Sequence, residues 1–364
     1  MQHKGVYRGS VLLSYLTQSL TVAPYESFST MHSSEWECFE IVRLLTAEGF
    51  DVDVINWDDT NFIPQKKYDI VIDTQKNLER LSKYLPAPTL KIMYVVASHT
   101  EFQNNAEKMR LKELKERRSV TLVPHRTETS SKNIEVADIV VGLGNATTKE
   151  TYAFAHKDIE TIPISSTISF EKNPTKNVDA QKKFLWIGGG GAVLKGLDRV
   201  LEAFKDLPDL DLTVCGPVKQ ENDFNKAYHA ELYETQNIHY LGRIDPLSGT
   251  FQKIAETHGF LIYPSASEGQ SGAVITGLHA GLVPLASRNS GVDVDDFGFV
   301  LKTSSVEEIK ERVLYASNMP RQEFENLAKK VYSYANEHHT KKTFSLAWQN
   351  IIKTIIIPPL HTHE

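Results

Sequence analysis

The sequence predicts an α/β protein built from two doubly wound, Rossmann-like domains that face a central cleft. Strand-like and helix-like segments alternate along almost the whole chain, and 364 residues are about twice the usual size of one domain. Residues 171–182 contain no apolar cluster and divide the alternation into two series. We therefore expect domains at 1–175 and 183–340, followed by a C-terminal helix and tail at 341–364.

The first series begins with an apolar strand at Ser10–Thr17 and a helix whose expected start is the capping box Ser34–Glu37. Further strands are expected at Asp51–Trp57, Tyr68–Asp73, Lys91–Ser98 and Val136–Val141. Alternating strands and helices predict a parallel sheet with helices on both faces.

The second series begins with a strand at Phe184–Ile187 and a helix that ends near Phe204. Strands follow at Leu212–Cys215, Ile238–Leu241, Phe260–Pro264 and Val283–Ala286. Three helices, near Val306–Asn318, Gln322–His338 and Phe344–Ile355, close the chain. The last is amphipathic, and we expect it to return to the first domain and pack against it.

Composition narrows the classes of function. A net charge of −6 argues against a general nucleic-acid binder, whose domains are usually basic. Two cysteines, Cys38 and Cys215, exclude a disulfide framework and fit a reducing compartment. Neither a signal peptide nor a membrane span is evident, so we expect a cytoplasmic protein.

A glycine-rich turn lies between the strand and the helix that open the second series. It consists of Gly188, Gly189, Gly190 and Gly191, and Lys195 follows at the entrance of the helix. Glycine turns and helix N-termini bind phosphate oxygens, and a lysine adds charge for a pyrophosphate. A nicotinamide-binding unit would have an acidic residue at the end of the next strand, but Gly216 follows the strand Leu212–Cys215 here. The turn also lacks the sequence pattern of a P-loop.

An acidic turn opens a second helix about seventy residues later. Glu268 precedes Gly269, Ser271 and Gly272. A carboxylate would repel phosphate but accepts hydrogen bonds from sugar hydroxyls. Together, the two turns indicate a site for a phosphorylated sugar.

The acidic turn stands within a longer pattern, Tyr263–Gly272, Gly277–Gly281 and Val283–Ala286. This pattern resembles family 4 glycosyltransferases (glycosyl transferases group 1), which have the GT-B fold and read PSxxEGFGxxxxEAxAxGxPV here. Members read GRxxxxKGxxxLLxAF where this chain has Gly189–Phe204. The resemblance covers most of residues 184–352 and is one of arrangement alone before residue 170.

The resemblance implies a role for each matched residue. Lys195 would neutralise the diphosphate of a nucleotide diphospho-sugar donor, and Glu268 would contact the hydroxyls of the donor sugar. Gly269, Ser271 and Gly272 would open the helix whose amides face the diphosphate. Transfer would be retaining and metal-independent, with no cofactor besides the donor.

Two positions depart from the family pattern. Gly190 replaces an arginine that contacts phosphate, and Thr276 replaces the second acid of the E-x7-E motif, which holds the ribose. A hydrogen bond to a charged group contributes about 1.5–3 kcal/mol, against about 1 for a neutral one. Arg243 or Arg288 is a candidate for the missing cation; the alternative for each is a surface arginine.

His99 is the catalytic candidate in the first series, because it follows a strand at the carboxyl edge of the sheet. The alternative is a loop histidine without a role in the site. Glu101, Gln103, Asn104, Asn145 and His32 are weaker candidates for contacts with sugar hydroxyls or the acceptor.

Residues 108–118 (KMRLKELKERR) form a basic helical run with six cations. Such a run could dock on an anionic membrane that carries a lipid-linked acceptor. We favour the alternative, a solvated helix face with pairs such as Glu113 with Arg117.

We expect a retaining glycosyltransferase that moves a sugar from a nucleotide diphospho-sugar to a saccharide or lipid-linked acceptor. By resemblance, its setting is the assembly of bacterial surface polysaccharide. Two alternatives remain: a nucleotide-sugar epimerase, and a non-catalytic carbohydrate-binding or partner protein.

Overall fold

Two parallel six-stranded sheets organise the protein in the computed structural model, which describes residues 1–21 and 32–360. The first has the order β2-β1-β3-β4-β5-β6, and the second β12-β11-β10-β7-β8-β9. The first sheet contains β1 (Gly9–Tyr15), β2 (Phe50–Asn56), β3 (Ile70–Asp73), β4 (Leu90–Val95), β5 (Ile139–Gly142) and β6 (Glu160–Thr161). The second contains β7 (Lys183–Ile187), β8 (Asp211–Cys215), β9 (Ile238–Gly242), β10 (Phe260–Tyr263), β11 (Val283–Ser287) and β12 (Phe299–Leu301).

The helices alternate with these strands, as the sequence predicts. In the first half they are α1 (Gln18–Thr21), α2 (Ser34–Ala47), α3 (Leu78–Ser82), α4 (Thr100–Arg118), α5 (Asn133–Val136) and α6 (Ala146–Glu150). The second half has α7 (Leu197–Lys205), α8 (Asn222–Ala227), α9 (His229–Tyr233), α10 (Gly249–Thr257), α11 (Gly272–His279), α12 (Val306–Asn318), α13 (Arg321–His338), α14 (Lys341–Ile351) and α15 (Ile357–Leu360). The strand order and the alternation confirm two Rossmann-like sheets.

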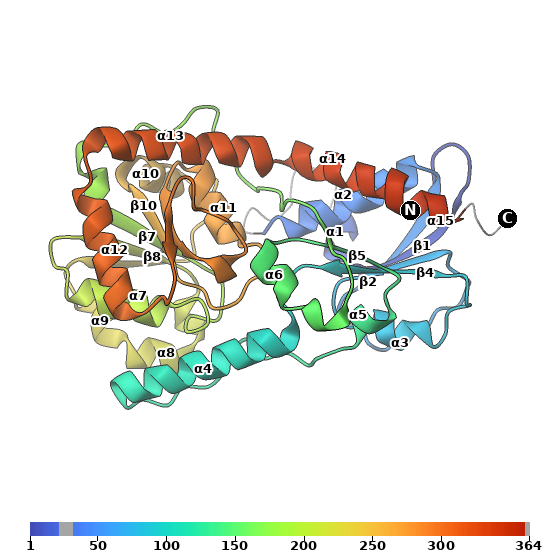
Figure 1. The fold of residues 1–364 in the computed structure, drawn as a ribbon, viewed down its shortest axis with the longest axis horizontal. Helices are drawn as coiled ribbons and strands as arrows, with labels where there is room; N and C mark the ends of the chain where they lie inside the picture. The colour runs from blue at the N-terminus through green and yellow to red at the C-terminus, as the bar shows by residue number, and fades with distance from the viewer. Residues whose placement is uncertain (22–31, 361–364) are drawn as a thin grey trace.

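Two helical bridges connect the halves on opposite sides of the molecule (Figure 1). Along the top, α13 leads into α14, which lies on α2 of the first half. The buried Trp348 ring of α14 packs 5.2 Å from the Tyr94 ring, and Ser345 Oγ donates to Glu40 Oε1. The amphipathic pattern of this segment is therefore explained by contacts with the first half.

The second bridge is α4, which follows the strand β4 of the first sheet and extends beneath the second sheet (Figure 1). Arg117 Nη2 lies 2.6 Å from Asp198 Oδ2 of α7, and its Nε lies 2.9 Å from Glu202. Arg118 pairs with the buried Glu231 of α9 at 2.7 Å. These ion pairs hold the halves together.

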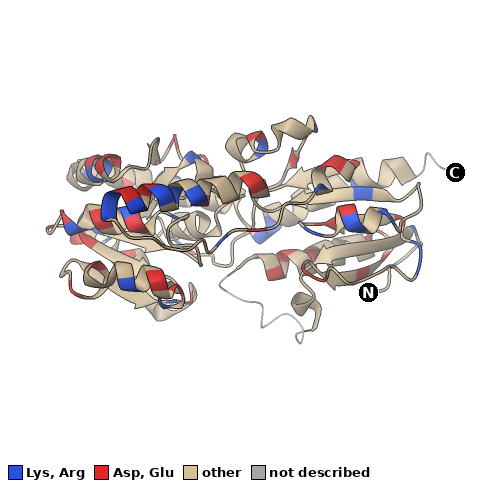
Figure 2. Cartoon of the chain, turned by 90° about the horizontal axis from the view of Figure 1, so that it is seen from below, with Lys and Arg blue, Asp and Glu red and all other residues tan. Residues whose placement is uncertain are grey.

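The basic run at 108–118 is therefore not a fully solvated helix face, because three of its arginines contact the second half. Arg110 is buried, Arg117 and Arg118 pair across the halves, and acidic residues alternate with the remaining cations along the helix (Figure 2). No helix among residues 1–21 and 32–360 is long and apolar enough to cross a membrane.

The predicted linker contains a buried lysine. Lys176 Nζ donates to the carbonyl oxygens of Ala255 and Ala280, near the C-terminal ends of α10 and α11. These bonds satisfy carbonyl groups at helix ends that have no intrahelical partners. Burial lowers the pKa of Lys176 to about 7.

Candidate active site

The glycine-rich turn follows β7, as predicted, but part of its anion-binding capacity is already used. The backbone N–H groups of Gly191 and Ala192 donate to the buried carboxylate of Glu221, at 2.6 and 3.1 Å. Gly191 adopts φ +90°, a conformation that favours glycine. Glu221 reaches the turn because β7 and β8 are parallel neighbours, so their carboxyl ends meet at one edge of the sheet.

Lys195 and Glu268 form an ion pair in the site, 2.5 Å from Nζ to Oε1. Tyr263, at the end of β10, donates its hydroxyl to the same oxygen at 2.8 Å and accepts from Lys195 at 3.1 Å. Ser265 Oγ donates to Glu268 Oε1 at 3.2 Å. The structure thus brings together the two residues on which the sequence prediction depends.

Each charge of this pair stabilises the ionised form of the other residue. Burial alone would favour neutral forms, but the attraction of Lys195 lowers the pKa of Glu268 below its ordinary value. In the same way, Glu268 raises the pKa of Lys195 against the effect of burial. Both groups are therefore charged near neutral pH, as a site for phosphate and sugar hydroxyls requires.

The first half of the chain holds the turn that carries Glu268. Ser98 Oγ donates to the Glu268 carbonyl at 2.5 Å, and Thr148 Oγ1 donates to the Gly269 carbonyl at 2.8 Å. A Cβ atom on Gly269 would come within 2.3 Å of the Val96 carbonyl oxygen, so this close approach requires glycine.

The start of α11 follows directly. Ser271 is its N-cap, and its side chain accepts from the Val274 N–H. Gly272 is the first helical residue, as predicted. Thr276 donates its hydroxyl to the Gly272 carbonyl at 2.8 Å, so its proton is used within the helix.

Arg126 is a cation that the sequence prediction missed. Its charge acts on both residues of the ion pair. It contributes to the lowered pKa of Glu268, and it partly opposes the rise in the pKa of Lys195 that Glu268 causes. The guanidinium has no hydrogen-bond partner among residues 1–21 and 32–360, so its donors are available to a ligand. Arg126 contributes a cation near the place where Gly190 lacks the family arginine.

The loop that carries Arg126 is held by buried side chains of α4. Glu107 accepts from the backbone N–H groups of His125 at 2.8 Å and Arg126 at 3.0 Å. Gln103 Nε2 donates to the Arg126 carbonyl at 2.6 Å. Asn104 exchanges two hydrogen bonds with the backbone of Glu128. Gln103 and Asn104, expected to contact sugar, instead position this loop.

Arg243 and His32 face the same region from opposite halves. Desolvation and the positive charges of Arg243 and Lys195 lower the pKa of His32. Arg243 follows β9 and is exposed, with no ion-pair partner in the described part of the chain. Residues 22–31, which directly precede His32 in the sequence, lie outside the described residues.

His99 occupies another environment. Its ring packs against Tyr152 and Phe154, with centroid separations of 5.3 and 4.8 Å. Its backbone N–H donates to Thr151 Oγ1 at 2.9 Å. The structure places Ser98, its neighbour, against the Glu268 turn instead.

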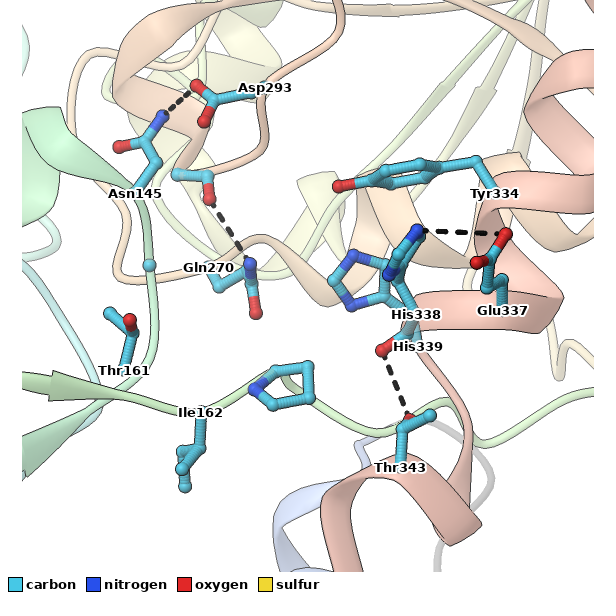
Figure 3. Close-up of a pocket in the computed structure, with 13 residues that line it drawn as sticks. Asn145, Thr161, Ile162, Gln270, Asp293, Tyr334, Glu337, His338, His339 and Thr343 are labelled. Atoms are coloured by element: carbon cyan, nitrogen blue, oxygen red, sulfur yellow. Dashed lines mark hydrogen bonds and ion pairs between the residues drawn. The ribbon is translucent and has the colours of Figure 1, made fainter. Parts of the chain in front are cut away.

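A cavity of about 390 Å³ lies between the halves, and its lining includes Gln270 of the acidic turn (Figure 3). Asn145 caps α6 and donates to Asp293 Oδ1 at 2.8 Å, while Gln270 accepts from the Ile164 N–H at 2.7 Å. These side chains join the halves. Arg288, the other candidate cation, pairs with Asp295 at 2.7 Å.

Topology contained a signal for Glu221 but not for Arg126. An acid that follows β8 must lie near the end of β7, because adjacent parallel strands end at the same edge. Arg126 stands in a loop without periodicity, and only its contacts with α4 bring it to the site. Among the described residues, no group of three or more His, Cys, Asp or Glu side chains could hold a metal ion.

The two Rossmann-like sheets, with the glycine-rich turn and the acidic turn at the carboxyl edge of the second, have the arrangement of the GT-B fold. Residues 168–338 match the family model described as glycosyl transferases group 1. The resemblance that the sequence predicts is confirmed over this range.

Solved structures agree on the fold. Alr3699/HepE of Anabaena is 12% identical, with a TM-score of 0.61, and the match covers 95% of this chain and 99% of that one. WaaG is 16% identical, with a TM-score of 0.56, and the match covers 95% of this chain and 100% of that one. TarM of S. aureus is 14% identical, with a TM-score of 0.55 and 78% of this chain covered; the match spans only 55% of TarM. No curated protein matches the sequence.

Proposed function

We propose that this protein is a retaining glycosyltransferase that uses a nucleotide diphospho-sugar. The observation that carries the proposal is the ion pair of Lys195 and Glu268 at the glycine-rich turn, with Arg126 and Arg243 close by. The cations suit a diphosphate, and the carboxylate suits the hydroxyls of a donor sugar. Complexes of similar folds point the same way: HepE was crystallised with UDP and glucose, and TarM with UDP.

In the proposed reaction, the bond between the anomeric carbon and the diphosphate oxygen breaks. Lys195 and Arg126 stabilise the charge that develops on the leaving diphosphate, while Glu268 orients the sugar. An acceptor hydroxyl forms the new bond on the face that the diphosphate leaves, and its proton passes to the leaving phosphate oxygen. Retention and metal independence rest on the family resemblance.

A saccharide or lipid-linked acceptor and a setting in surface polysaccharide synthesis belong to the same proposal. WaaG, whose fold is similar, is described as a glycosyltransferase of lipopolysaccharide biosynthesis. The peripheral membrane contact stays a prediction, which vesicle sedimentation with Lys112→Gln and Lys115→Gln variants tests. Equal sedimentation of wild type and variants would remove it.

The use of turn amides by Glu221 favours one alternative, a non-catalytic carbohydrate-binding or partner protein. Two N–H groups that would face a diphosphate already have a carboxylate partner. In that case the fold would be intact without any nucleotide affinity.

A thermal-shift screen of UDP-, GDP-, ADP- and dTDP-sugars separates the two. Stabilisation by one nucleotide, lost in Lys195→Ala, supports the transferase and names the donor base. Transfer to a saccharide acceptor then completes the assignment, whereas donor conversion without acceptor would indicate the epimerase. No stabilisation by any nucleotide would refute the transferase proposal.

A further inference from the structure

A second cavity, of about 330 Å³, lies where α4 crosses the carboxyl ends of β10, β11 and β12. Its lining includes Arg110 from α4 and Ser265, Ser287, Arg288, Asn289 and Lys302 from the second half. A volume near the lower end of the usual range for ligand sites suits a small molecule. Both halves of the chain contribute to its walls.

Positive charge dominates this cavity. Arg110 is 7% exposed; its Nη2 donates to the Pro264 carbonyl at 2.9 Å, but its Nη1 has no hydrogen-bond partner in the described part of the chain. Burial and the neighbouring charge of Arg199 lower the pKa of Arg110 to about 10. A buried guanidinium with a free N–H group is costly, and an anion would satisfy it.

The other lining cations add to this excess. Lys302 is exposed, and within residues 1–21 and 32–360 its ammonium group has no ion-pair partner. Arg288 pairs with Asp295, which lies outside the lining. The lining residues themselves include neither aspartate nor glutamate. The carboxylates of Asp198 and Glu113, whose charges act on Arg110, stand outside this lining.

Neutral polar groups complete the lining and suit hydroxyls beside the anion. The Asn289 amide has no hydrogen-bond partner among the described residues. Ser287 Oγ donates to the Ser265 carbonyl at 2.5 Å, which leaves its lone pairs as acceptors. A sugar hydroxyl could donate to either residue.

We propose that this cavity binds a small phosphorylated sugar, with the phosphate on Arg110 and Lys302 and the sugar hydroxyls on Asn289 and Ser287. The site is separate from the one proposed for the donor, whose cations are Lys195, Arg126 and Arg243. The ligand would contact α4 of the first half and three strand ends of the second, and would therefore favour the arrangement in which both halves are joined.

A ligand in this cavity would also affect the proposed donor site through Ser265. Ser265 lines the cavity, and its Oγ lies 3.2 Å from Glu268 Oε1. A ligand that hydrogen-bonds to Ser265 would change the environment of the carboxylate, so occupancy would couple to the orientation of the donor sugar.

Isothermal titration of the full chain with glucose 6-phosphate, inorganic phosphate and glucose tests the proposal. We expect glucose 6-phosphate to bind more tightly than phosphate, and glucose not to bind. Because one charged hydrogen bond contributes about 1.5–3 kcal/mol, Lys302→Gln and Arg110→Gln should each weaken binding by roughly tenfold or more. Lys302 is exposed, so Lys302→Gln remains informative even if Arg110→Gln fails to fold.

Two controls separate this site from the proposed donor site. Arg243→Gln should leave sugar-phosphate affinity unchanged, and saturating UDP should not displace the sugar phosphate. Absence of binding, unchanged affinity in Lys302→Gln, or displacement by UDP would each overturn the proposal. Equal affinity for inorganic phosphate would overturn the assignment of a sugar. None of these outcomes depends on whether the protein transfers sugar.

Discussion

Arg126 lies against Gly191, so closely that a Cβ atom on this glycine would come within 2.4 Å of Arg126 Cγ. Residues from the two halves of the chain, 65 positions apart in the sequence, thus meet at the glycine-rich turn. The missing side chain at Gly191 makes room for the stem of a cation, which reaches the site only when the halves are together.

The first prediction concerns this contact. Gly191→Ala should destabilise the protein by about 1–3 kcal/mol, because alanine must adopt φ +90° and displace Arg126. Urea unfolding measures the change. Gly189→Ala is the matched control, since its Cβ atom would meet nothing within 4 Å. Equal losses in both variants would contradict the argument.

Arg126 itself should contribute to nucleotide binding. Arg126→Gln removes a cation whose charge acts on Lys195 and Glu268, so we expect roughly tenfold weaker binding of the nucleotide diphosphate with little loss of stability. Titration calorimetry measures the affinity. Lys112→Gln, on the exposed face of α4, removes the same charge and should leave affinity unchanged.

Glu221 should affect stability and ligand affinity in opposite directions. Glu221→Gln weakens the charged hydrogen bonds to Gly191 and Ala192, which should cost about 1–3 kcal/mol of unfolding free energy. It also removes a negative charge beside the proposed diphosphate, so nucleotide affinity should rise. If affinity fell together with stability, Glu221 would act by shaping the turn and not by competing with phosphate.

The ion pairs of α4 should determine how firmly the halves are joined. Arg117→Ala leaves the buried Asp198 carboxylate without its partner at 2.6 Å, which should cost about 1.5–3 kcal/mol. Small-angle scattering should then show a larger radius of gyration than for wild type. Lys115→Ala on the same helix serves as the control. An unchanged radius would mean that the other contacts between the halves, such as Arg118 with Glu231 and Thr148 with Gly269, maintain the arrangement without Arg117.

Stability should fall as the solution becomes mildly acidic. Burial lowers the pKa of His258 and of His339 to about 4, from an ordinary value of 6.5. Between these values the unfolded chain binds more protons than the folded one, so the stabilisation present above about pH 6.5 is lost as pH falls toward 4. Each histidine contributes up to about 1.4 kcal/mol per pH unit in that window.

Urea unfolding at about pH 7 and about pH 5 measures this loss. His258→Asn should reduce the difference between the two pH values, although it also perturbs the 2.8 Å hydrogen bond with Thr213. If His258→Asn left the difference between the two pH values unchanged, the His258 imidazole would not be a source of the loss.

Local pattern was sufficient for most elements, although it did not predict β6 or β12, and β5 starts at Ile139 and not at the expected Val136. The helix over Val306–Asn318 has the predicted bounds, and α13 starts one residue before the predicted Gln322. Lys195 and Glu268 meet because each follows a strand, and β7 and β10 are parallel neighbours whose carboxyl ends share an edge. Strand order therefore converts two separate motifs into one ion pair.

The capping box at Ser34–Glu37 shows where local pattern fails. Ser33 precedes the helix without a side-chain cap, and the Glu37 carboxylate is buried, where it accepts from the backbone and hydroxyl of Ser165. The Glu37 side chain therefore does not close a capping box, because a buried carboxylate needs several donors and Ser165, far along the chain, supplies two of them.

The sequence alone was enough to indicate two α/β halves, a glycine-rich turn with Lys195, an acidic turn with Glu268 and the resemblance to glycosyl transferases group 1 that residues 168–338 match. Tertiary structure decided the rest: Arg126 entered the site, Glu221 took part of the turn, and His99 packed against aromatic rings. Strands and turns follow from periodic patterns within one segment. Which charges meet across a cleft depends on how α4 and α14 join the two halves, and no periodicity in either half encodes that.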